Sequence, residues 1–351
     1  MKTEQKTTLR QLIFDIPKTE IHLHLEGMVT VQTLWTLIKR NNLQIEGIQT
    51  REDLSQKYNF KSLDGFIWFY INVLQNCFQN AEDLELLIDD ARNYLEANNI
   101  IYSEIFFAPT KFLQNGLNFK DMISVLSKGA KTLHDKHGIT IKYLIDVSRG
   151  FGPENAMHNL QLTLEHKNEY IIGIGLGGAE SQGPAKDYKE VFVKAKANGL
   201  KIVAHAGEDV GPESIWSALR DLHAERIGHG ISSIKDNKLM AYLKETQIPL
   251  EVCPTSNVFT RKYVDKIENH PIRALFDNGV YITLNTDDPT LFAVDLITEY
   301  MNLYEYLQFK PEELFQLMKN NIYATSLSEK LKETLWKKAS AVIEKAGYTL
   351  N

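Results

Sequence analysis

The stretch EDLELLIDDARNYLEANNIIYSEIFFAP, residues 82–109, contains the pattern that decides the fold of this chain. Within residues 82–98 the apolar side chains recur three and four positions apart, which predicts a helix with one buried face. Residues 102–109 are rich in aromatic and β-branched side chains, which favour a strand. A second stretch with helical periodicity, residues 119–134, follows that strand. The local unit is therefore a strand followed by a helix.

This unit recurs along the chain. Eight β-rich runs, each followed by a longer segment, lie at residues 19–25, 102–109, 140–148, 171–178, 200–208, 224–230, 248–257 and 280–289. Parallel strands need long crossover connections, and eight of them can close on themselves. The sequence therefore predicts an α/β fold of the (β/α)8 TIM-barrel class. An open, doubly wound sheet is the alternative, but the GxGxxG turn expected after its first strand is missing from residues 22–27 (HLHLEG).

The longest insertion, residues 32–78, separates the first two predicted strands. Phe66, Trp68, Phe69 and Tyr70 form an aromatic cluster within it. We expect an extra helical cap over the barrel mouth, with ordinary core packing as the alternative for these aromatic side chains. Because no low-complexity segment, linker or charge block interrupts the chain, residues 1–351 are expected to form a single domain.

The composition argues against several classes of protein. The 351 residues include 39 Lys and Arg against 45 Asp and Glu, a formal charge of −6, whereas proteins that follow nucleic-acid phosphates normally carry a basic excess. No apolar run reaches the ~18 residues of a membrane span and no signal peptide is recognisable, so we expect a soluble, cytoplasmic protein without nucleic-acid or membrane partners. Cys77 and Cys253 are far apart in the sequence, which disfavours a disulfide framework or a thiolate zinc site. The oligomeric state stays open.

His22 and His24 alternate with apolar residues in the first predicted strand. A spacing of two places both imidazoles on the same face of a strand, which in a barrel is the interior. Ring nitrogens buried there need a partner, because burying an unsatisfied polar group is costly. A metal ion is the simplest partner, although a lone HxH motif also occurs on solvent-exposed faces.

Three later strands also end in ionisable side chains, at residues 203–208 (VAHAGE), 227–230 (IGHG) and 285–289 (NTDDP). The C-terminal ends of barrel strands meet at one face, so these groups are expected to converge there. A set of three His and one Asp suits zinc or a similar cation, and a barrel mouth can keep a position for water, as catalytic sites do. A single metal is favoured, because the fourth strand ends in GLGGAE (residues 175–180), without the Lys that often bridges two ions.

Such a site favours hydrolysis at neutral pH, because zinc lowers the pKa of a water that it binds. Glu208, three residues beyond His205, can reach over the metal as an acid or base, although a solvated loop carboxylate is the simpler interpretation of a Glu. His229 lies between two glycines, which let backbone and substrate approach closely.

Seven short motifs occur in order along the chain: HLH (22–24), SL (62–63) with Phe66, GG (177–178), HAGE (205–208), RIGHG (226–230), EVCP (251–254) and NTDDP (285–289). With them the chain resembles the adenosine deaminase family, the mononuclear-zinc branch of the amidohydrolase barrels, from about residue 15 to beyond residue 300. Each motif alone is weak, and their order at barrel-strand spacing is specific.

The resemblance implies a role for each matching residue. One Zn2+ per chain would be bound by His22, His24, His205 and Asp287, together with the attacking water. Glu208 would protonate N1 of a purine, and His229 would orient and deprotonate the water. Asp288 would form a hydrogen bond at N7, and the backbone of Gly178 would meet N3. The residues implied to contact substrate are His24, Glu26, Gly178, Asp288, Phe66 and Tyr70, the last two on a helix that closes over it.

The implied reaction is hydrolytic deamination of adenosine or 2′-deoxyadenosine to inosine or 2′-deoxyinosine plus ammonia. Glu26 stands where adenosine deaminases usually have Asp, and the GLGG turn lacks their acidic residues at positions 175 and 179. These departures favour the alternative of the same chemistry on adenine, 5′-methylthioadenosine or 6-aminodeoxyfutalosine. Phe106 replaces the usual Arg. A catalytically silent binding protein on the same barrel is disfavoured, because every implied ligand and the catalytic acid are present.

Overall fold

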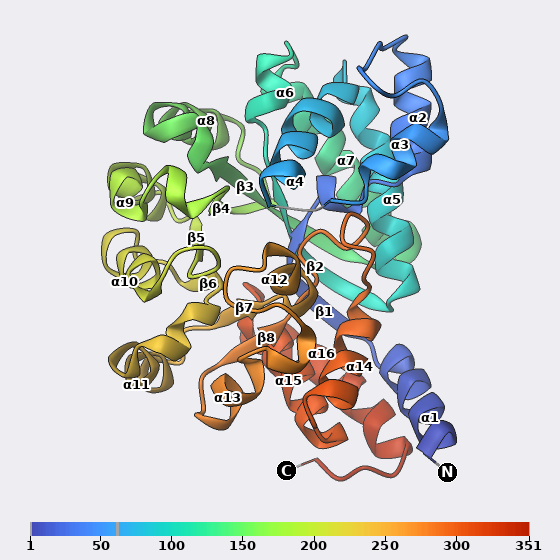
Figure 1. Cartoon of the computed structure of the whole chain (residues 1–351), viewed down its shortest axis with the longest axis vertical. Coiled ribbons are helices and arrows are strands. Elements are labelled where there is room, and N and C mark those ends of the chain that lie inside the picture. Colours follow the sequence, from blue (N-terminus) through green and yellow to red (C-terminus); the bar gives the residue numbers. More distant parts are fainter. Residues whose placement is uncertain (1, 61–62, 351) are drawn as a thin grey trace.

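Eight strands follow one another around a single sheet in the order of the chain. The computed structural model describes residues 2–60 and 63–350. Neighbouring strands in the sheet run parallel, with helices in the connections, which confirms the predicted TIM barrel (Figure 1). The strands are β1 Lys18–His24, β2 Ile100–Phe107, β3 Thr140–Ser148, β4 Ile171–Gly177, β5 Lys201–Ala206, β6 Arg226–His229, β7 Leu250–Val252 and β8 Ile282–Leu284.

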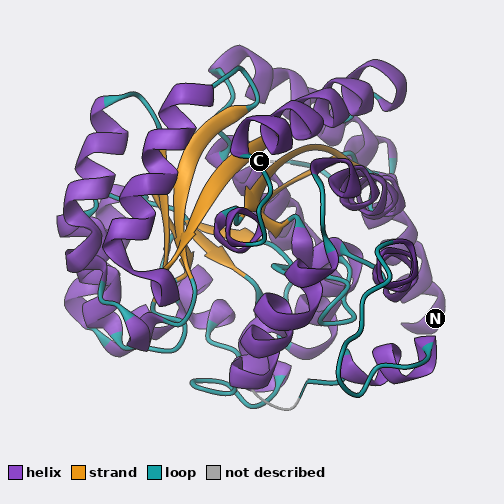
Figure 2. Cartoon of the chain, turned by 90° about the horizontal axis from the view of Figure 1, so that it is seen from above, coloured by secondary structure: helices purple, strands orange, loops and turns teal. Residues whose placement is uncertain are grey.

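Helices surround the strands, as Figure 2 shows. Within the described residues, no helix combines the length and the apolar character needed to cross a membrane. The helices are α1 Lys2–Asp15, α2 Val31–Arg40, α3 Arg51–Lys57, α4 Leu63–Phe69, α5 Leu84–Ala97, α6 Thr110–Gln114, α7 Phe119–His137, α8 Gly152–His166, α9 Lys189–Ala197, α10 Pro212–Asp221, α11 Asn237–Thr246, α12 Pro254–Thr260, α13 Ile272–Asp277, α14 Leu296–Tyr306, α15 Pro311–Ala324 and α16 Glu329–Lys345.

The apolar core has two parts. The larger part lies between the strands and the surrounding helices and includes the buried Cys77, which is a free thiol. A small second cluster, Phe106, Leu144 and Val203, belongs to the inner face of the barrel. Residues two and four positions after these three also face the interior, but they lie nearer the C-terminal mouth. The alternation of a strand therefore places polar side chains in the site.

The inserted residues 32–78 form the predicted helical cap, with α2, α3 and α4 between β1 and β2 (Figure 1). Thr30 caps α2 by accepting from the Thr33 N–H, and Thr50 forms a capping box with Asp53 at α3. Ser62, part of the SL motif, lies outside the described residues. The cap brings α4 and the turn that follows it to the barrel mouth.

The sequence predicts longer seventh and eighth strands, residues 248–257 and 280–289, than the structure has. β7 ends at Val252 because Pro254, at the first position of α12, starts a helix. β8 ends at Leu284, and Asp287 beyond it has a left-handed backbone with φ of 70°. The segments wrongly predicted as strand are those that turn side chains into the mouth.

The barrel closes through side chains as well as backbone. Among the described residues, one isolated bridge, Leu23–Asp287, joins β1 to the chain beyond β8. The His24 N–H donates to the Asp287 carbonyl at 3.0 Å, and the Asp287 N–H donates to the His22 carbonyl at 3.1 Å. The side chain of Asn285 accepts from the N–H groups of Ile21 and His22 at 3.1 and 3.2 Å.

Asn321 of α15 holds the other side of this seam. Its Oδ1 accepts from the Leu284 N–H at 2.9 Å, and its Nδ2 donates to the Leu284 carbonyl at 2.8 Å and the Thr19 carbonyl at 3.3 Å. Asn321→Ala leaves these buried backbone groups without partners, so we expect a loss of about 2–4 kcal/mol of unfolding free energy in urea titrations. Gln316→Ala, on the exposed side of α15, should stay within about 0.5 kcal/mol of wild type. Equal effects of the two variants would contradict the role of Asn321.

Candidate functional site

A cavity lies at the C-terminal ends of the strands, where the catalytic sites of barrel enzymes are found. Side chains from β1, β3, β5 and β6, from the segments after β4 and β8, and from α4 line it. Most of the residues that the sequence predicts for the site are in this lining, namely His24, Phe66, Tyr70, Gly178, His205, Glu208, His229, Asp287 and Asp288. His22 is fully buried beside them, and Glu26 is not part of the lining.

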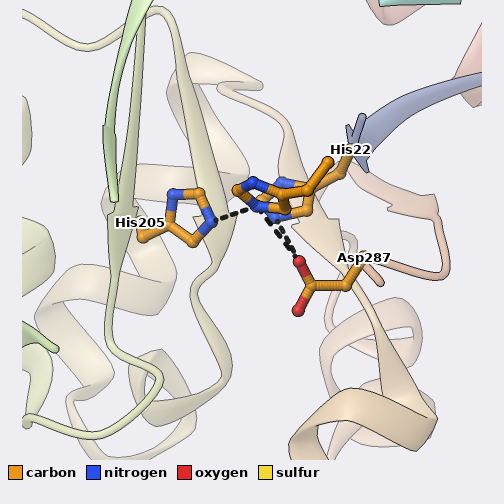
Figure 3. A group of neighbouring side chains, drawn as sticks. His22, His205 and Asp287 are labelled. Atoms are coloured by element: carbon orange, nitrogen blue, oxygen red, sulfur yellow. Dashed lines mark hydrogen bonds and ion pairs between the residues drawn. The ribbon is translucent and has the colours of Figure 1, made fainter. Parts of the chain in front are cut away.

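His22, His24, His205 and Asp287 form a compact group whose potential ligand atoms all lie within 4.8 Å of one another. The Nε2 atoms of His24 and His205 are 3.2 Å apart, and Oδ1 of Asp287 lies 3.5 Å from Nε2 of His22 and 3.2 Å from Nε2 of His24. In Figure 3 the side chains of His22, His205 and Asp287 point toward one another. The structure therefore brings together four predicted site residues from three separate regions of the chain.

The donor atoms of this group suit a cation. Nδ1 of His22 lies 2.7 Å from Glu251, to which it donates, so the lone pair of its neutral ring is on Nε2. That Nε2 atom is buried and makes no hydrogen bond within the described residues. A divalent metal would satisfy it together with the facing nitrogens of His24 and His205, and Asp287 would supply negative charge. Three nitrogen donors and one oxygen are a usual ligand set for zinc-like ions.

A chain of buried charges orients His22. Glu251 accepts from His22 and also from Nε of Arg226, and the Arg226 guanidinium forms an ion pair with Glu104 at 2.7 Å. Glu104 in turn accepts from the Tyr102 hydroxyl at 2.9 Å and from the N–H of Ser326 at 2.6 Å. A carboxylate behind a metal-binding imidazole fixes its tautomer and raises its basicity.

Glu208 is placed by the carboxylate of Glu180. Glu180 accepts from the backbone N–H groups of Gly207, Glu208 and Asp209 at 2.9, 2.7 and 3.0 Å. Gly207, with φ of 74°, turns the chain out of β5 so that the Glu208 side chain reaches the cavity. Burial and the negative charge of Asp287 raise the pKa of Glu208 well above its usual range. These surroundings therefore favour the protonated form of the Glu208 carboxyl.

A directed chain of hydrogen bonds fixes the neutral form of His229. The Ile272 N–H donates to Nδ1 of His270 at 3.1 Å, so Nε2 of His270 carries the proton and donates to Oδ1 of Asn257 at 3.2 Å. The Asn257 amide then donates to Nδ1 of His229 at 3.1 Å. Neutral His229 therefore carries its proton on Nε2, which lies 3.4 Å from Oε2 of Glu208. Burial lowers the pKa of His229 to about 3.

Backbone strain accompanies these side chains. His229 and Asp287 both have left-handed backbones, with φ of 61° and 70°, a region that costs a residue with a Cβ atom free energy. Ser256 donates to Oδ2 of Asp287 at 2.7 Å and so holds the carboxylate that is turned into the mouth.

Glu26 lies outside the cavity lining. Its Oε1 accepts from Nε2 of Gln75 at 3.2 Å and from the Ala108 N–H at 3.1 Å, while Gln75 and Ala108 themselves line the cavity. Oε2 of Glu26 is buried without a hydrogen bond to any described residue. Burial raises the pKa of Glu26 to about 7. Gln75 and Ala108 thus contact both Glu26 and the cavity, whereas Glu26 itself does not line it.

The aromatic residues of the cap divide into two groups. Phe66 and Tyr70 line the cavity, and Phe66 also packs against Phe259 and Phe292 with ring centroids 6.0 and 5.0 Å away. Both interpretations of Phe66, lining and packing, therefore hold. Trp68 is 56% exposed and is not part of this cavity.

Phe106, which stands where the family usually has Arg, fills space that glycine leaves open. Its ring stacks on His24 with centroids 5.1 Å apart. A Cβ atom on Gly175 would lie 2.7 Å from Cε1 of Phe106, closer than real Cβ atoms approach. The loss of a side chain at position 175 and the aromatic ring at position 106 are therefore complementary.

Some residues of the site were not identified from the sequence. Glu180, Asn257 and His270 place Glu208 and His229, and Asp146 lines the cavity. In the sequence they look like ordinary polar residues in or after β-rich runs. For Glu180 and Asn257 the signal in the sequence was their place shortly after strands β4 and β7, which end at the mouth.

Comparisons with known proteins agree with this geometry. The family described as "Adenosine deaminase" matches residues 17–342. The chain is 34% identical to an adenine deaminase of Psychrobacter cryohalolentis over 92% of this chain and 96% of that protein. It is also 34% identical to an aminodeoxyfutalosine deaminase of Streptomyces avermitilis, over 91% and 89%, and to an adenosine deaminase of Clostridium acetobutylicum, over 94% and 99%.

Solved structures show the same architecture. An adenine deaminase from Arthrobacter aurescens superposes with a TM-score of 0.88 at 29% identity, over 94% of this chain and 99% of that one. An amidohydrolase from Burkholderia ambifaria, solved with bound Zn, shares the fold with a TM-score of 0.87 at 23% identity, over 96% of this chain and 94% of that one. The chain belongs to the adenosine deaminase family, and it is a hydrolase that acts on the C–N bond of an amidine.

Proposed function

We propose that this protein is a zinc-dependent deaminase that replaces the 6-amino group of a purine with oxygen from water and releases ammonia. The observation that carries the proposal is the juxtaposition of the group His22, His24, His205 and Asp287 with a partly buried Glu208 in one cavity. A cation site and a proton-bearing carboxyl side by side are what hydrolytic deamination requires.

The four residues of this group would hold Zn2+, with the unpartnered Nε2 of His22 as one donor. When bound, the ion lowers the pKa of a coordinated water and so supplies a nucleophile at neutral pH. The side chains of the protein would then place the purine, protonate its ring and hold the water.

Glu208 would donate its proton to N1 of the purine, which makes C6 more electrophilic. The resemblance also implies that His229 deprotonates the water. The proton on its Nε2 supports the narrower role of a donor that holds the attacking oxygen beside Glu208. Asp288 would bind N7, and because N7 is an acceptor, the Asp288 carboxyl has to carry a proton in that complex. The backbone of Gly178 would meet N3.

Adenosine and 2′-deoxyadenosine are the first substrates to consider, since they are the default of the family resemblance. The position of Glu26 favours a second group, namely adenine or a nucleoside modified at its 5′ position. In the structure Glu26 accepts from Gln75 and Ala108 and does not line the cavity, which disfavours a contact of its carboxylate with a 5′-hydroxyl. Apolar side chains of Phe66, Ile67, Ile71, Phe151 and Phe292 line the cavity and suit an apolar 5′ substituent.

Glu251→Gln should weaken zinc binding by about 10- to 100-fold, because the neutral amide supports the His22 imidazole less well than a carboxylate. The dissociation constant is measured by competition with a chromophoric chelator. Glu299→Gln is the matched control, because Glu299 is equally buried but accepts from the Thr255 N–H rather than from a site histidine. Unchanged zinc affinity in Glu251→Gln would contradict the orienting role.

Glu208→Gln should keep zinc and lose about 100-fold or more in turnover, as the removal of a general acid typically does. Ammonia release and zinc content are measured on the same sample. Asp209→Asn, a change at the next residue of the same loop, should keep most of the activity. Near wild-type turnover of Glu208→Gln would rule out its assignment as the acid.

The substrate is tested with a panel of adenosine, 2′-deoxyadenosine, adenine, 5′-methylthioadenosine and 6-aminodeoxyfutalosine, compared by kcat/KM for ammonia release. If Glu26 stays behind the cap, adenosine should be poorer than adenine or a 5′-modified nucleoside. Adenosine as the best substrate would show that Glu26 reaches the 5′-hydroxyl. No ammonia from any of the five would overturn the proposed function.

A further inference from the structure

Asp146 is a buried carboxylate that has no part in the chemistry above. It lies on the inner face of β3, is 4% exposed and lines the cavity. Its Oδ1 atom makes no hydrogen bond to any described residue. Arg149, the cation three residues further on, donates instead to the carbonyls of Gly183 and His205 at 2.6 Å each. Burying an acceptor without a hydrogen bond costs free energy of folding. This oxygen is therefore expected to accept a hydrogen bond from a ligand.

Strand β4 makes room for this carboxylate. Asp146 pairs with Gly175 in the β3–β4 ladder, and Gly173, Gly175 and Gly177 alternate along the inner face of β4. A Cβ atom on Gly175 would lie 2.6 Å from Oδ1 of Asp146, and one on Gly177 would collide with its Oδ2. The Asp146 carboxylate therefore packs against the backbone of glycines. The GLGG segment leaves the space that this carboxylate occupies.

We propose that Asp146 accepts a hydrogen bond from an N–H or O–H donor on the substrate edge that carries N3 and N9 of the purine. This inference rests on the proposed function, in which Gly178 meets N3. Gly178 directly follows Gly177, against which Asp146 packs. On that edge a free base offers N9–H and a nucleoside offers its 2′-hydroxyl, and both are donors that suit a carboxylate. Asp146 thus determines specificity on the side of the purine where Glu26 is out of reach.

The experiment compares substrate pairs in which only one member carries this donor. Adenine is paired with 9-methyladenine, and adenosine with 2′-deoxyadenosine, in zinc-loaded wild type and Asp146→Ala. We expect the wild type to prefer the donor-bearing member of one pair, and Asp146→Ala to reduce that preference in kcat/KM by about 10- to 100-fold. A change in the first pair identifies N9–H as the donor, and a change in the second identifies the 2′-hydroxyl. If both preferences are the same in variant and wild type, the proposal is wrong.

Binding of the unreactive products separates this inference from the proposed function. Dissociation constants are measured for hypoxanthine against 9-methylhypoxanthine and for inosine against 2′-deoxyinosine. If the wild type deaminates nothing but Asp146→Ala still removes the binding preference, the proposed function fails and the role of Asp146 stands. If the wild type deaminates nothing and binds no purine of either pair, both fail.

Two further variants guard against indirect effects. Asp146→Asn keeps the shape of the side chain and one acceptor oxygen, so it replaces the Ala variant if that variant does not fold, with an expected reduction of about 3- to 10-fold. Asp90→Asn changes a buried carboxylate that caps the Thr30 N–H outside the cavity, and it should leave both preferences unchanged. An equal loss of preference in Asp90→Asn would assign the effect to general damage and overturn the proposal.

Discussion

Three imidazole nitrogens and one carboxylate oxygen meet within 4.8 Å of one another in the interior of the barrel, and much of the structure serves to hold them there. Such a group is unfavourable without a cation, because the lone pairs of buried nitrogen and oxygen acceptors face one another. The ion pairs of Arg226 with Glu104 and Glu251 fix one imidazole from behind. Ser256 fixes the carboxylate from the side. Several buried charged side chains therefore serve to orient the few atoms of this group.

Two residues next to the substrate space are positioned by the same principle. The carboxylate of Glu180 gathers three consecutive backbone N–H groups and so places Glu208. The relay from His270 through Asn257 gives His229 a defined direction of hydrogen bonding. Both devices use residues that do not line the cavity, namely Glu180, Asn257 and His270, whereas Phe66, Tyr70 and Asp146 do line it. The residues that orient Glu208 and His229 are therefore different from the residues that line the cavity.

The strand-and-helix repeat was enough to predict the barrel, because parallel strands impose crossovers whose length is visible in the sequence. His22 and His24 could be predicted to face the barrel interior because they follow the parity of an apolar strand, and His205 and Asp287 were expected at the mouth because β-rich runs end there. Predictions were wrong where the backbone leaves the strand, after Val252 and Leu284, because a left-handed residue or a proline helix start there depends on tertiary contacts. The place of Glu26 could not be predicted either, since Gln75, which holds it, is 49 residues away.

The seam between β1 and the chain beyond β8 has a consequence for how the protein can change. Backbone bonds at this seam involve His22, His24 and Asp287, the same residues whose side chains form the cation site. Substitutions there alter closure of the barrel and the reactive centre together, so this sector leaves little freedom for new substrates. The cap and strands β3 and β4 take part neither in this closure nor in the group His22, His24, His205 and Asp287. The glycines on the inner face of β4 and the side chain of Asp146 on β3 form a part of the cavity wall that can change together. The cation site at the seam between β1 and the chain beyond β8 can stay the same while they do.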